Sequence, residues 1–169
     1  MFRRLLKNSL PAWILLGILL GTVIKLFVLD VLSISGSSML PTFKNGSSAP
    51  VFKLAYGLVK PFRGDFFVQW AEPQKDDIVI FLHDNKIVIK RVVLVSGEQL
   101  DFSADSEYSL LVQQKAVPLT ERQYRSLSAF TEVPHGFVLV LGDNPEASID
   151  SRDYGFVSVK NITGKILGK

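Results

Sequence analysis

The sequence of 169 residues contains no cysteine and only two histidines, His83 and His135. The absence of cysteine excludes disulfide bonds, thiolate metal sites and cysteine-protease chemistry. Two histidines argue against a His-rich metal site, and we expect neither a metal nor another cofactor. The formal net charge of +3 is modest and the basic residues are spread along the chain, so we expect no nucleic-acid partner. A single compact domain is expected at this length.

Charged residues are also missing from residues 8–24, which read NSLPAWILLGILLGTVI. Lys25 follows, and then the apolar run from Leu26 to Leu29. A membrane span needs about 20 mostly apolar residues, so we predict a transmembrane anchor over residues 10–29. Lys25 then lies near one end, where its long side chain can reach the headgroups.

Three basic residues, Arg3, Arg4 and Lys7, precede this apolar run. The positive-inside rule then predicts that residues 1–9 lie in the cytoplasm and that residues 30–169 lie on the outer side. We therefore expect a single-pass protein of the cytoplasmic membrane.

A cleaved secretory signal has the same basic and apolar pattern. No alanine occurs from Trp13 to Ser48, however, so an Ala-x-Ala cleavage site is missing, and Ser33 with Ser35 is a weak substitute. A buried core helix is a third interpretation, which the unbroken apolar length disfavours. We favour the uncleaved anchor.

Beyond the anchor the pattern is typical of β-structure. Short runs rich in β-branched and aromatic residues lie between turn-forming residues. They cover residues 66–70, 77–83, 86–95, 108–113 and 136–142. Asp84-Asn85 between two apolar runs predicts a tight hairpin over 77–95, and residues 119–130 are the best candidate for a short helix. Short strands without alternating long helices predict a mainly antiparallel β domain.

The first segment that carries chemistry is Gly36-Ser37-Ser38-Met39-Leu40-Pro41-Thr42, directly after the anchor. Its small residues let the backbone approach a bound peptide, and Pro41 stiffens the turn that presents the serine. Such a cluster, taken alone, is more often an ordinary loop.

The second is Lys90, in the middle of KIVIKRVVLV. Alternate residues of a strand share a face, so Lys90 points with Val88 and Val92, and Arg91 points the other way. A lysine flanked in this way is desolvated, which lowers its pKa from the usual value of about 10.4. The competing interpretation is an edge strand that uses both cations to block aggregation.

The third is the segment from Gly142 to Gly155, GDNPEASIDSRDYG, which is dense in turn formers and charges. A solvated loop with a capping Ser or Asp explains these residues equally well. The spacing of its glycines and acids does not match an EF-hand.

These segments, in this order, resemble the conserved boxes of the bacterial type I signal peptidases. The matching patterns are G-x-S-M-x-P-T, I-K-R-V-V with a following glycine, and G-D-N…S-x-D-S-R-x-x-G. The stretch Lys53-Leu54-Ala55-Tyr56-Gly57 with Pro61-Phe62, and Lys25 late in the anchor, are also similar to the family. The resemblance covers about residues 10 to 168 and implies a β-sheet catalytic domain of the signal-peptidase and LexA-like type.

The resemblance implies a serine endopeptidase that removes signal peptides from exported preproteins after small residues at positions −1 and −3. Ser38 would be the nucleophile and Lys90 its general base. It further implies that Ser148 orients the lysine amine. The supporting residues would be Asp150, Arg152 and Asp143, the last paired with Arg91. Membrane lipid and the export translocon are the other expected partners.

The oxyanion hole would include the Ser38 N–H. Gly36 stands where some members carry a serine hydroxyl, which leaves Ser35 or Ser37 as substitutes. The substrate would bind as an added strand. Its shallow pockets would be lined by Ile34, Ser35, Gly36, Met39, Phe43, Val88 and Ile89.

The chain also departs from the family pattern. Pro145 replaces the arginine common after G-D-N, and the short interval from Arg91 to Leu141 implies a reduced second subdomain within about residues 97–135. A conjugation-type or organellar inner-membrane peptidase remains an alternative. The endoplasmic-reticulum enzyme has a histidine in place of Lys90, and LexA-like repressors need a DNA-binding domain, so both are disfavoured. An inactive membrane-tethered β domain that binds peptides is the alternative from another class.

Overall fold

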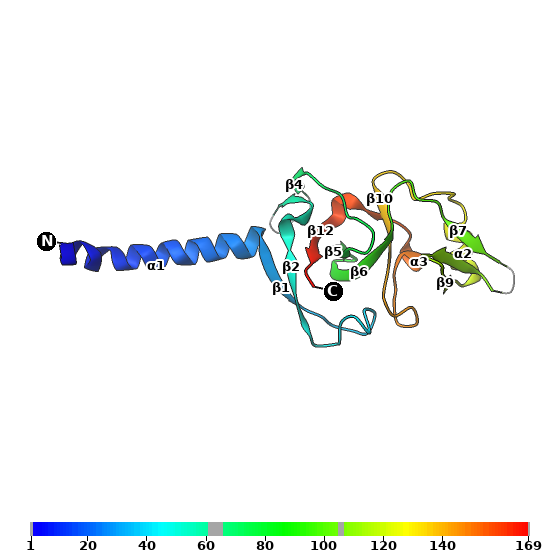
Figure 1. Cartoon of the computed structure of the whole chain (residues 1–169), viewed down its shortest axis with the longest axis horizontal. Coiled ribbons are helices and arrows are strands. Elements are labelled where there is room, and N and C mark those ends of the chain that lie inside the picture. The colour runs from blue at the N-terminus through cyan, green and yellow to red at the C-terminus, as the bar shows by residue number, and fades with distance from the viewer. Residues whose placement is uncertain (1, 61–65, 105–106, 169) are drawn as a thin grey trace.

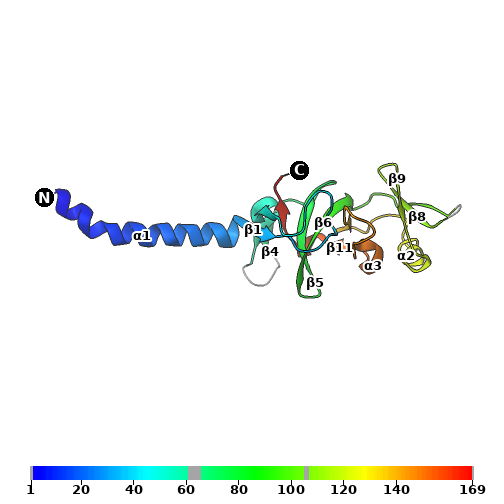
Figure 2. The ribbon, with the colours of Figure 1, turned by 90° about the horizontal axis from the view of Figure 1, so that it is seen from below.

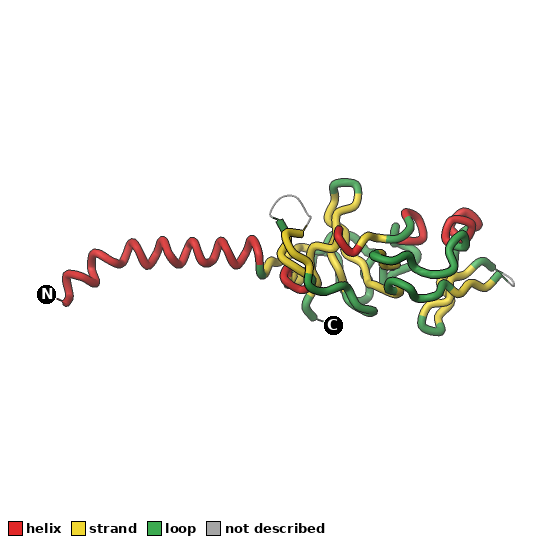
Figure 3. The backbone as a smooth tube through the Cα atoms, turned by 90° about the horizontal axis from the view of Figure 1, so that it is seen from above, coloured by secondary structure: helices red, strands yellow, loops and turns green. Residues whose placement is uncertain are grey.

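The structure is a computed structural model that describes residues 2–60, 66–104 and 107–168, with side chains described from Leu10 onward. Helix α1 (Phe2–Phe27) extends away from the remainder of the molecule and carries the N-terminus at its tip (Figures 1 and 3). Residues Leu10–Phe27 have a mean hydropathy of 2.1, and none of this stretch is buried. This helix is long and apolar enough to cross a membrane. Leu29, the last residue of the predicted anchor, already belongs to the first strand.

The domain after α1 is built on a seven-stranded antiparallel sheet in the order β1-β2-β12-β5-β6-β10-β11. Its strands are β1 (Leu29–Ser33), β2 (Ser48–Phe52), β5 (Ile78–His83), β6 (Lys86–Leu94), β10 (Phe137–Leu141), β11 (Val157–Ser158) and β12 (Ile162–Ile166). The prediction of a mainly antiparallel β domain behind an apolar helix is confirmed.

Two smaller sheets flank this one. Strands β3 (Gly57–Val59) and β4 (Phe66–Gln69) form a pair, and β7 (Asp101–Ser103), β8 (Ser109–Val112) and β9 (Lys115–Pro118) form a meander. The meander and helix α2 (Glu121–Leu127) lie at the end of the molecule opposite α1 (Figures 1 and 2). They fall in the interval where the reduced second subdomain was expected. The remaining helices are short: η1 (Lys53–Ala55), α3 (Ser151–Tyr154) and η2 (Val159–Asn161).

Each of the five apolar runs singled out in the sequence contains a strand, and α2 lies within the predicted helical segment. Asp84 and Asn85 both have positive φ, 48° and 59°, which is the backbone that a two-residue hairpin turn requires. The turn sets the register, pairing His83 with Lys86 and Val79 with Lys90. The predicted motif residues Pro61 and Phe62 lie outside the described residues.

Residues Ile78–Phe81 of β5 are buried on both faces of the sheet, which explains their continuous apolar sequence. Val79 and Phe81 pack with Val92 of β6 in one cluster, on one face of the sheet. Ile78 and Ile80 pack on the other face. The second cluster also contains Ile34 and Met39, so the sheet core holds the segment around Ser38 in place.

Candidate active site

Ser38 lies on the loop between β1 and β2. Its neighbour Met39 is 2% exposed and packs in the sheet core, while Ser38 itself is half-buried. The base of the loop is closed by Ile34 N–H, which donates to Ser47 O at 2.8 Å, and by Gly36 N–H, which donates to Asn45 Oδ1 at 3.0 Å. Gly36 has φ +97°, a conformation that favours glycine. The serine is therefore presented on a loop whose base is closed by hydrogen bonds.

Lys90 is 4% exposed on β6. It lies on the face of β6 that carries Val88 and Val92, as strand alternation predicts. Burial lowers the pKa of Lys90 and outweighs the opposing effect of the Asp150 charge. No described residue forms a hydrogen bond or an ion pair with its amine. The described residues thus leave this buried amine without a partner, and burial makes it easier to deprotonate than an exposed lysine.

Ser38 and Lys90 line one groove with a volume of about 500 Å³. We call it the Ser38–Lys90 groove. Its lining residues are Leu32, Ser33, Ile34, Ser35, Gly36, Ser37, Ser38, Met39, Ile87, Val88, Ile89, Lys90, Ala147 and Ile149.

Six of the seven predicted substrate-binding residues lie in this lining: Ile34, Ser35, Gly36, Met39, Val88 and Ile89. Phe43 does not, and this corrects the expectation. Its ring packs against the core cluster that contains Met39, so it supports the wall of the groove from behind. The sequence interpretation missed Leu32, Ser33, Ile87, Ala147 and Ile149.

The groove runs beside unpaired strand edges. On the side of β6 away from β5, strand β10 pairs only with Arg91, Val92 and Leu94. The stretch of β6 from Lys86 to Lys90 therefore has a free edge among the described strands. Strand β1 is also an edge strand and pairs with β2 alone. An extended peptide in this groove can add to such an edge through main-chain hydrogen bonds.

The loop from Gly142 to Gly155 is held by a buried ion pair. Asp150 is fully buried, and Arg152 Nε donates to Asp150 Oδ1 at 2.9 Å. Arg152 Nη2 also donates to the carbonyls of Pro145 and Ser148. Burial raises the pKa of Asp150, but the hydrogen bonds from Arg152 and from Gly142 N–H outweigh it, so the net pKa is lowered. Both charges are thus satisfied inside the loop, as a buried pair requires.

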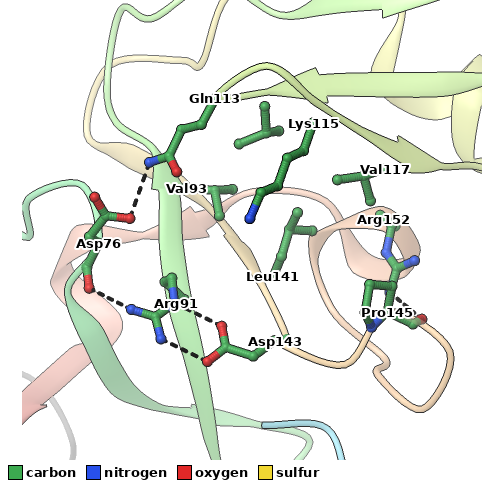
Figure 4. Close-up of a pocket in the computed structure, with 12 residues that line it drawn as sticks. Asp76, Arg91, Val93, Gln113, Lys115, Val117, Leu141, Asp143, Pro145 and Arg152 are labelled. Carbon is green, nitrogen blue, oxygen red and sulfur yellow. Dashed lines mark hydrogen bonds and ion pairs between the residues drawn. The ribbon is translucent and has the colours of Figure 1, made fainter. Parts of the chain in front are cut away.

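A second ion pair joins this loop to β6 (Figure 4). Arg91 Nε and Nη2 donate to the two Asp143 oxygens, each at 2.7 Å, and the Thr42 hydroxyl donates to Asp143 as well. Arg91 Nη1 also donates to Asp76 O, at 3.2 Å. Because Arg91 follows Lys90 and Thr42 follows the serine turn, this network fixes all three motif segments relative to one another.

Ser148 is 9% exposed, and its Oγ has no hydrogen-bond partner of regular geometry among the described residues. It lies against Gly142, where an added Cβ would come within 2.2 Å of Ser148 Oγ and 2.6 Å of Ser38 O. Asn144 N–H donates to the same Ser38 carbonyl at 3.0 Å, and Asn144 Nδ2 donates to Ser37 O at 3.2 Å. The serine loop and the Ser148 loop therefore meet at Gly142 and Asn144.

Three residues of this assembly, Thr42, Gly142 and Asn144, were not assigned a site role from the sequence. Each lies inside a quoted motif, and that position is the signal that could have identified them. The remaining predicted support residues, Arg91, Asp143, Ser148, Asp150 and Arg152, all lie in the assembly described above.

A serine hydroxyl and a buried, unpartnered amine that share one groove in an antiparallel β domain are typical of serine peptidases with an amine base. A family model described as "Signal peptidase, peptidase S26" matches residues 6–168. The chain belongs to this family, and it is a serine endopeptidase.

Curated relatives share most of the chain. A signal peptidase I of Bacillus caldolyticus is 34% identical over 149 residues, covering 85% of this chain and 80% of the relative. A probable signal peptidase I-1 of Synechocystis is 28% identical over 170 residues, covering 96% of this chain and 81% of the relative. A crystal structure of a signal peptidase I from Enterococcus faecalis covers 57% of this chain and 97% of that one, at 28% identity and a TM-score of 0.42.

Proposed function

We propose that this chain removes N-terminal signal peptides from exported preproteins, with Ser38 as nucleophile and Lys90 as general base. The observation that carries the proposal is the buried Lys90 amine without a described partner, in the same groove as Ser38. The names of the relatives supply the substrate class.

In the proposed reaction the Ser38 hydroxyl attacks the scissile carbonyl carbon while neutral Lys90 takes its proton. The resulting ammonium gives that proton to the departing amine, which leaves an acyl-enzyme on Ser38. Water then attacks the ester carbonyl carbon and loses a proton to Lys90. The bond from Ser38 Oγ to the acyl carbon breaks, Lys90 returns its proton to Ser38 Oγ, and the acid product departs with both side chains restored. The amine must be neutral at the start of each half-reaction, and burial of Lys90 favours that state.

The developing oxyanion needs donors close to Ser38. No described residue accepts a hydrogen bond from the Ser38 N–H, so this group is free to serve. Gly36 offers no side chain. Ser35 and Ser37 both line the groove and are the candidates for a second donor.

Ser148 is assigned the orientation of the Lys90 amine. Its buried hydroxyl lacks a hydrogen-bond partner of regular geometry. The same hydroxyl lies against Gly142, and the Ser38 carbonyl oxygen lies against Gly142 as well. Asp150 with Arg152, and Asp143 with Arg91, act as positioning residues that hold the loop and β6 in register.

The substrate is proposed to add as a strand to the free edge of β6, with small side chains at −1 and −3 in the shallow pockets. Met39, Val88 and Ile34 supply apolar walls.

We further propose that α1 anchors the chain in the cytoplasmic membrane, with residues 1–9 inside and the domain from residue 30 outside. The exposed apolar surface of Leu10–Phe27 supports the anchor. Lipid is then a direct partner, and the export translocon supplies the substrate.

The test uses purified full-length protein in detergent micelles and a preprotein with an Ala-x-Ala cleavage site. Ser38→Ala, Lys90→Ala and Lys90→Arg should each lower kcat/KM by at least about 10³-fold, because a guanidinium cannot serve as a base. Ser126→Ala and Lys160→Ala are the matched controls, since both residues are exposed and lie outside the groove and outside the free edge of β6. Full activity of Ser38→Ala would overturn the assignment.

A further inference from the structure

A second cavity, of about 270 Å³, lies where α1 meets the domain. We call it the helix-end cavity. Its walls are mainly apolar and come from Leu26 in the last turn of α1, Val59 on β3, and Val51, Ile80 and Leu82 of the large sheet. Because α1 itself is bare along its apolar length, this cavity opens beside the end of the proposed membrane anchor.

Polar interactions at the rim of the helix-end cavity connect the end of α1 to the large sheet. Lys53 Nζ lies 2.8 Å from Asp30 Oδ2 and donates to Lys25 O at 3.0 Å. The charges at this rim are therefore paired with each other. Lys60 and Thr163 also line the cavity, and its other lining side chains are aliphatic.

The helix-end cavity is continuous with the Ser38–Lys90 groove. Leu32 and Ile87 line both. These two residues lie on β1 and β6, at the end of the groove away from Ser38 and Lys90 along both strands. The groove and the cavity therefore adjoin at these two residues, and together their linings reach from Ser38 and Lys90 to Leu26 in the last turn of α1.

We propose that the helix-end cavity binds apolar side chains of the substrate on the N-terminal side of position −3. The inference rests on the proposed function, and it fixes the direction of the bound chain. The signal-peptide side lies toward α1, and the mature side leaves past Ala147 and Ile149.

The direction of the bound peptide follows from its length per residue and from the position of its apolar segment. A chain whose scissile bond lies at Ser38 advances about 3.3 Å per residue along the groove, so residues just upstream of −3 pass Leu32 and Ile87 if they run toward α1. A signal peptide carries its apolar segment on that side, and a mature chain begins with polar residues more often than not. Apolar side chains gain free energy by entering the helix-end cavity, whereas polar ones lose hydration. Continuity with the groove favours the substrate over a free lipid chain as the occupant.

The test compares two synthetic substrates with the same residues from −3 to +3, one beginning at −4 and the other extended upstream by five leucines. Leu82→Glu should lower kcat/KM for the extended substrate by about tenfold, and change that for the short one less than about twofold. Leu82 suits this test because it is 46% exposed and belongs to no core cluster. Val31→Glu is the matched control. It makes the same kind of change on the opposite face of β1, where Val31 is 66% exposed, and it should spare both substrates.

Equal effects of Leu82→Glu on both substrates, or no effect on either, would overturn the inference. A photoreactive residue at position 82, with the Ser38→Ala protein in phospholipid vesicles, should capture the extended peptide. Capture of lipid alone would assign the helix-end cavity to lipid and overturn the proposal. If the unmodified chain cleaves neither substrate, the proposed function itself fails, which is a different result from a cleaved short substrate with no dependence on Leu82.

Discussion

At the scale of single residues, the proposed reaction depends on the protonation state of the Lys90 amine. Protonated Lys90 cannot accept the Ser38 proton, so kcat/KM should rise with pH as the amine loses its charge. Burial lowers the pKa of Lys90, so the midpoint should fall below the ordinary lysine value of 10.5. A pH–rate profile of the free enzyme measures this midpoint.

A variant that removes the charge of Asp143 gives a second test of the pKa of Lys90. The Asp143 carboxylate raises the pKa of Lys90, so Asp143→Asn should move the midpoint to lower pH while keeping a hydrogen-bond acceptor for Thr42. A midpoint that stays in place or moves up would contradict this account of the site. Asp84→Asn, in the exposed hairpin turn, is the control and should leave the profile unchanged.

At Gly142 the segment that carries Ser148 and the segment that carries Ser38 come close together. A methyl group there would come within 2.6 Å of both Ser148 Cβ and Ser38 O, so one of the two segments must shift. Gly142→Ala should lower kcat by at least about tenfold, because small misplacements of catalytic groups are costly. Gly21→Ala on α1 meets nothing within 4 Å and should keep full activity. Activity equal to that of the control would show that the contact has no role in catalysis.

At the scale of elements, the ion pair of Arg91 and Asp143 joins β6 to the Ser148 loop, and Thr42 adds the Ser38 loop. The pair is partly buried, with exposures of 23% and 13%, so removing one partner leaves a poorly solvated charge. Arg91→Ala should lower the free energy of unfolding by about 1–3 kcal/mol and reduce activity along with it. Urea unfolding of the full-length chain in micelles measures the first effect.

The control for this element is an exposed ion pair. Lys75 and Glu98 lie 2.9 Å apart but are 36% and 34% exposed, so Lys75→Ala should cost less than about 1 kcal/mol. If the two variants lose equal stability, then the Arg91 network does not fasten the segments together.

Local pattern was sufficient for some elements and not for others. The β5–β6 hairpin was predictable because both strands are apolar and Asp84-Asn85 tolerates positive φ. The face of Lys90 followed from the two-residue period of a strand. Strand β12 was missed as a sheet member because it inserts between β2 and β5, far from both in sequence. Such pairings depend on the whole chain rather than on any local window.

The same limit applies to the groove. Its motif residues were predictable from the sequence. Leu32 was not, because it lies on edge strand β1, which is separated from β6 by three strands in the sheet order and yet lines the same groove. Phe43 was assigned to the groove because it follows the serine turn, and only packing shows that it faces the core. Ile149 lies between two functional positions, Ser148 and Asp150, and is 73% exposed at the rim of the groove.

At the scale of the whole molecule, the question is which environment surrounds the exposed apolar helix α1. Leu10–Phe27 would expose most of its apolar surface to water unless it lies in a bilayer. The chain should therefore stay with the membrane fraction after an alkaline wash. A Leu16→Arg, Leu19→Arg double variant should be released, because each arginine costs about 2.5–3.5 kcal/mol at a span centre. Lys25→Leu, which removes a charge near the helix end, should remain bound.

The orientation can be tested because the chain has no cysteine. A single Ser126→Cys on helix α2 and a single Ser9→Cys before the span each introduce one reactive thiol into an otherwise unreactive protein. With the N-terminus inside, an impermeant maleimide added to intact cells should label Ser126→Cys and spare Ser9→Cys until the membrane is opened. The reverse pattern would place the Ser38–Lys90 groove on the cytoplasmic side, where a preprotein has not yet been translocated. The proposed topology would then be wrong. The label therefore tests the one feature that the geometry of the domain alone does not fix, the side of the membrane on which the catalytic pair meets its substrate.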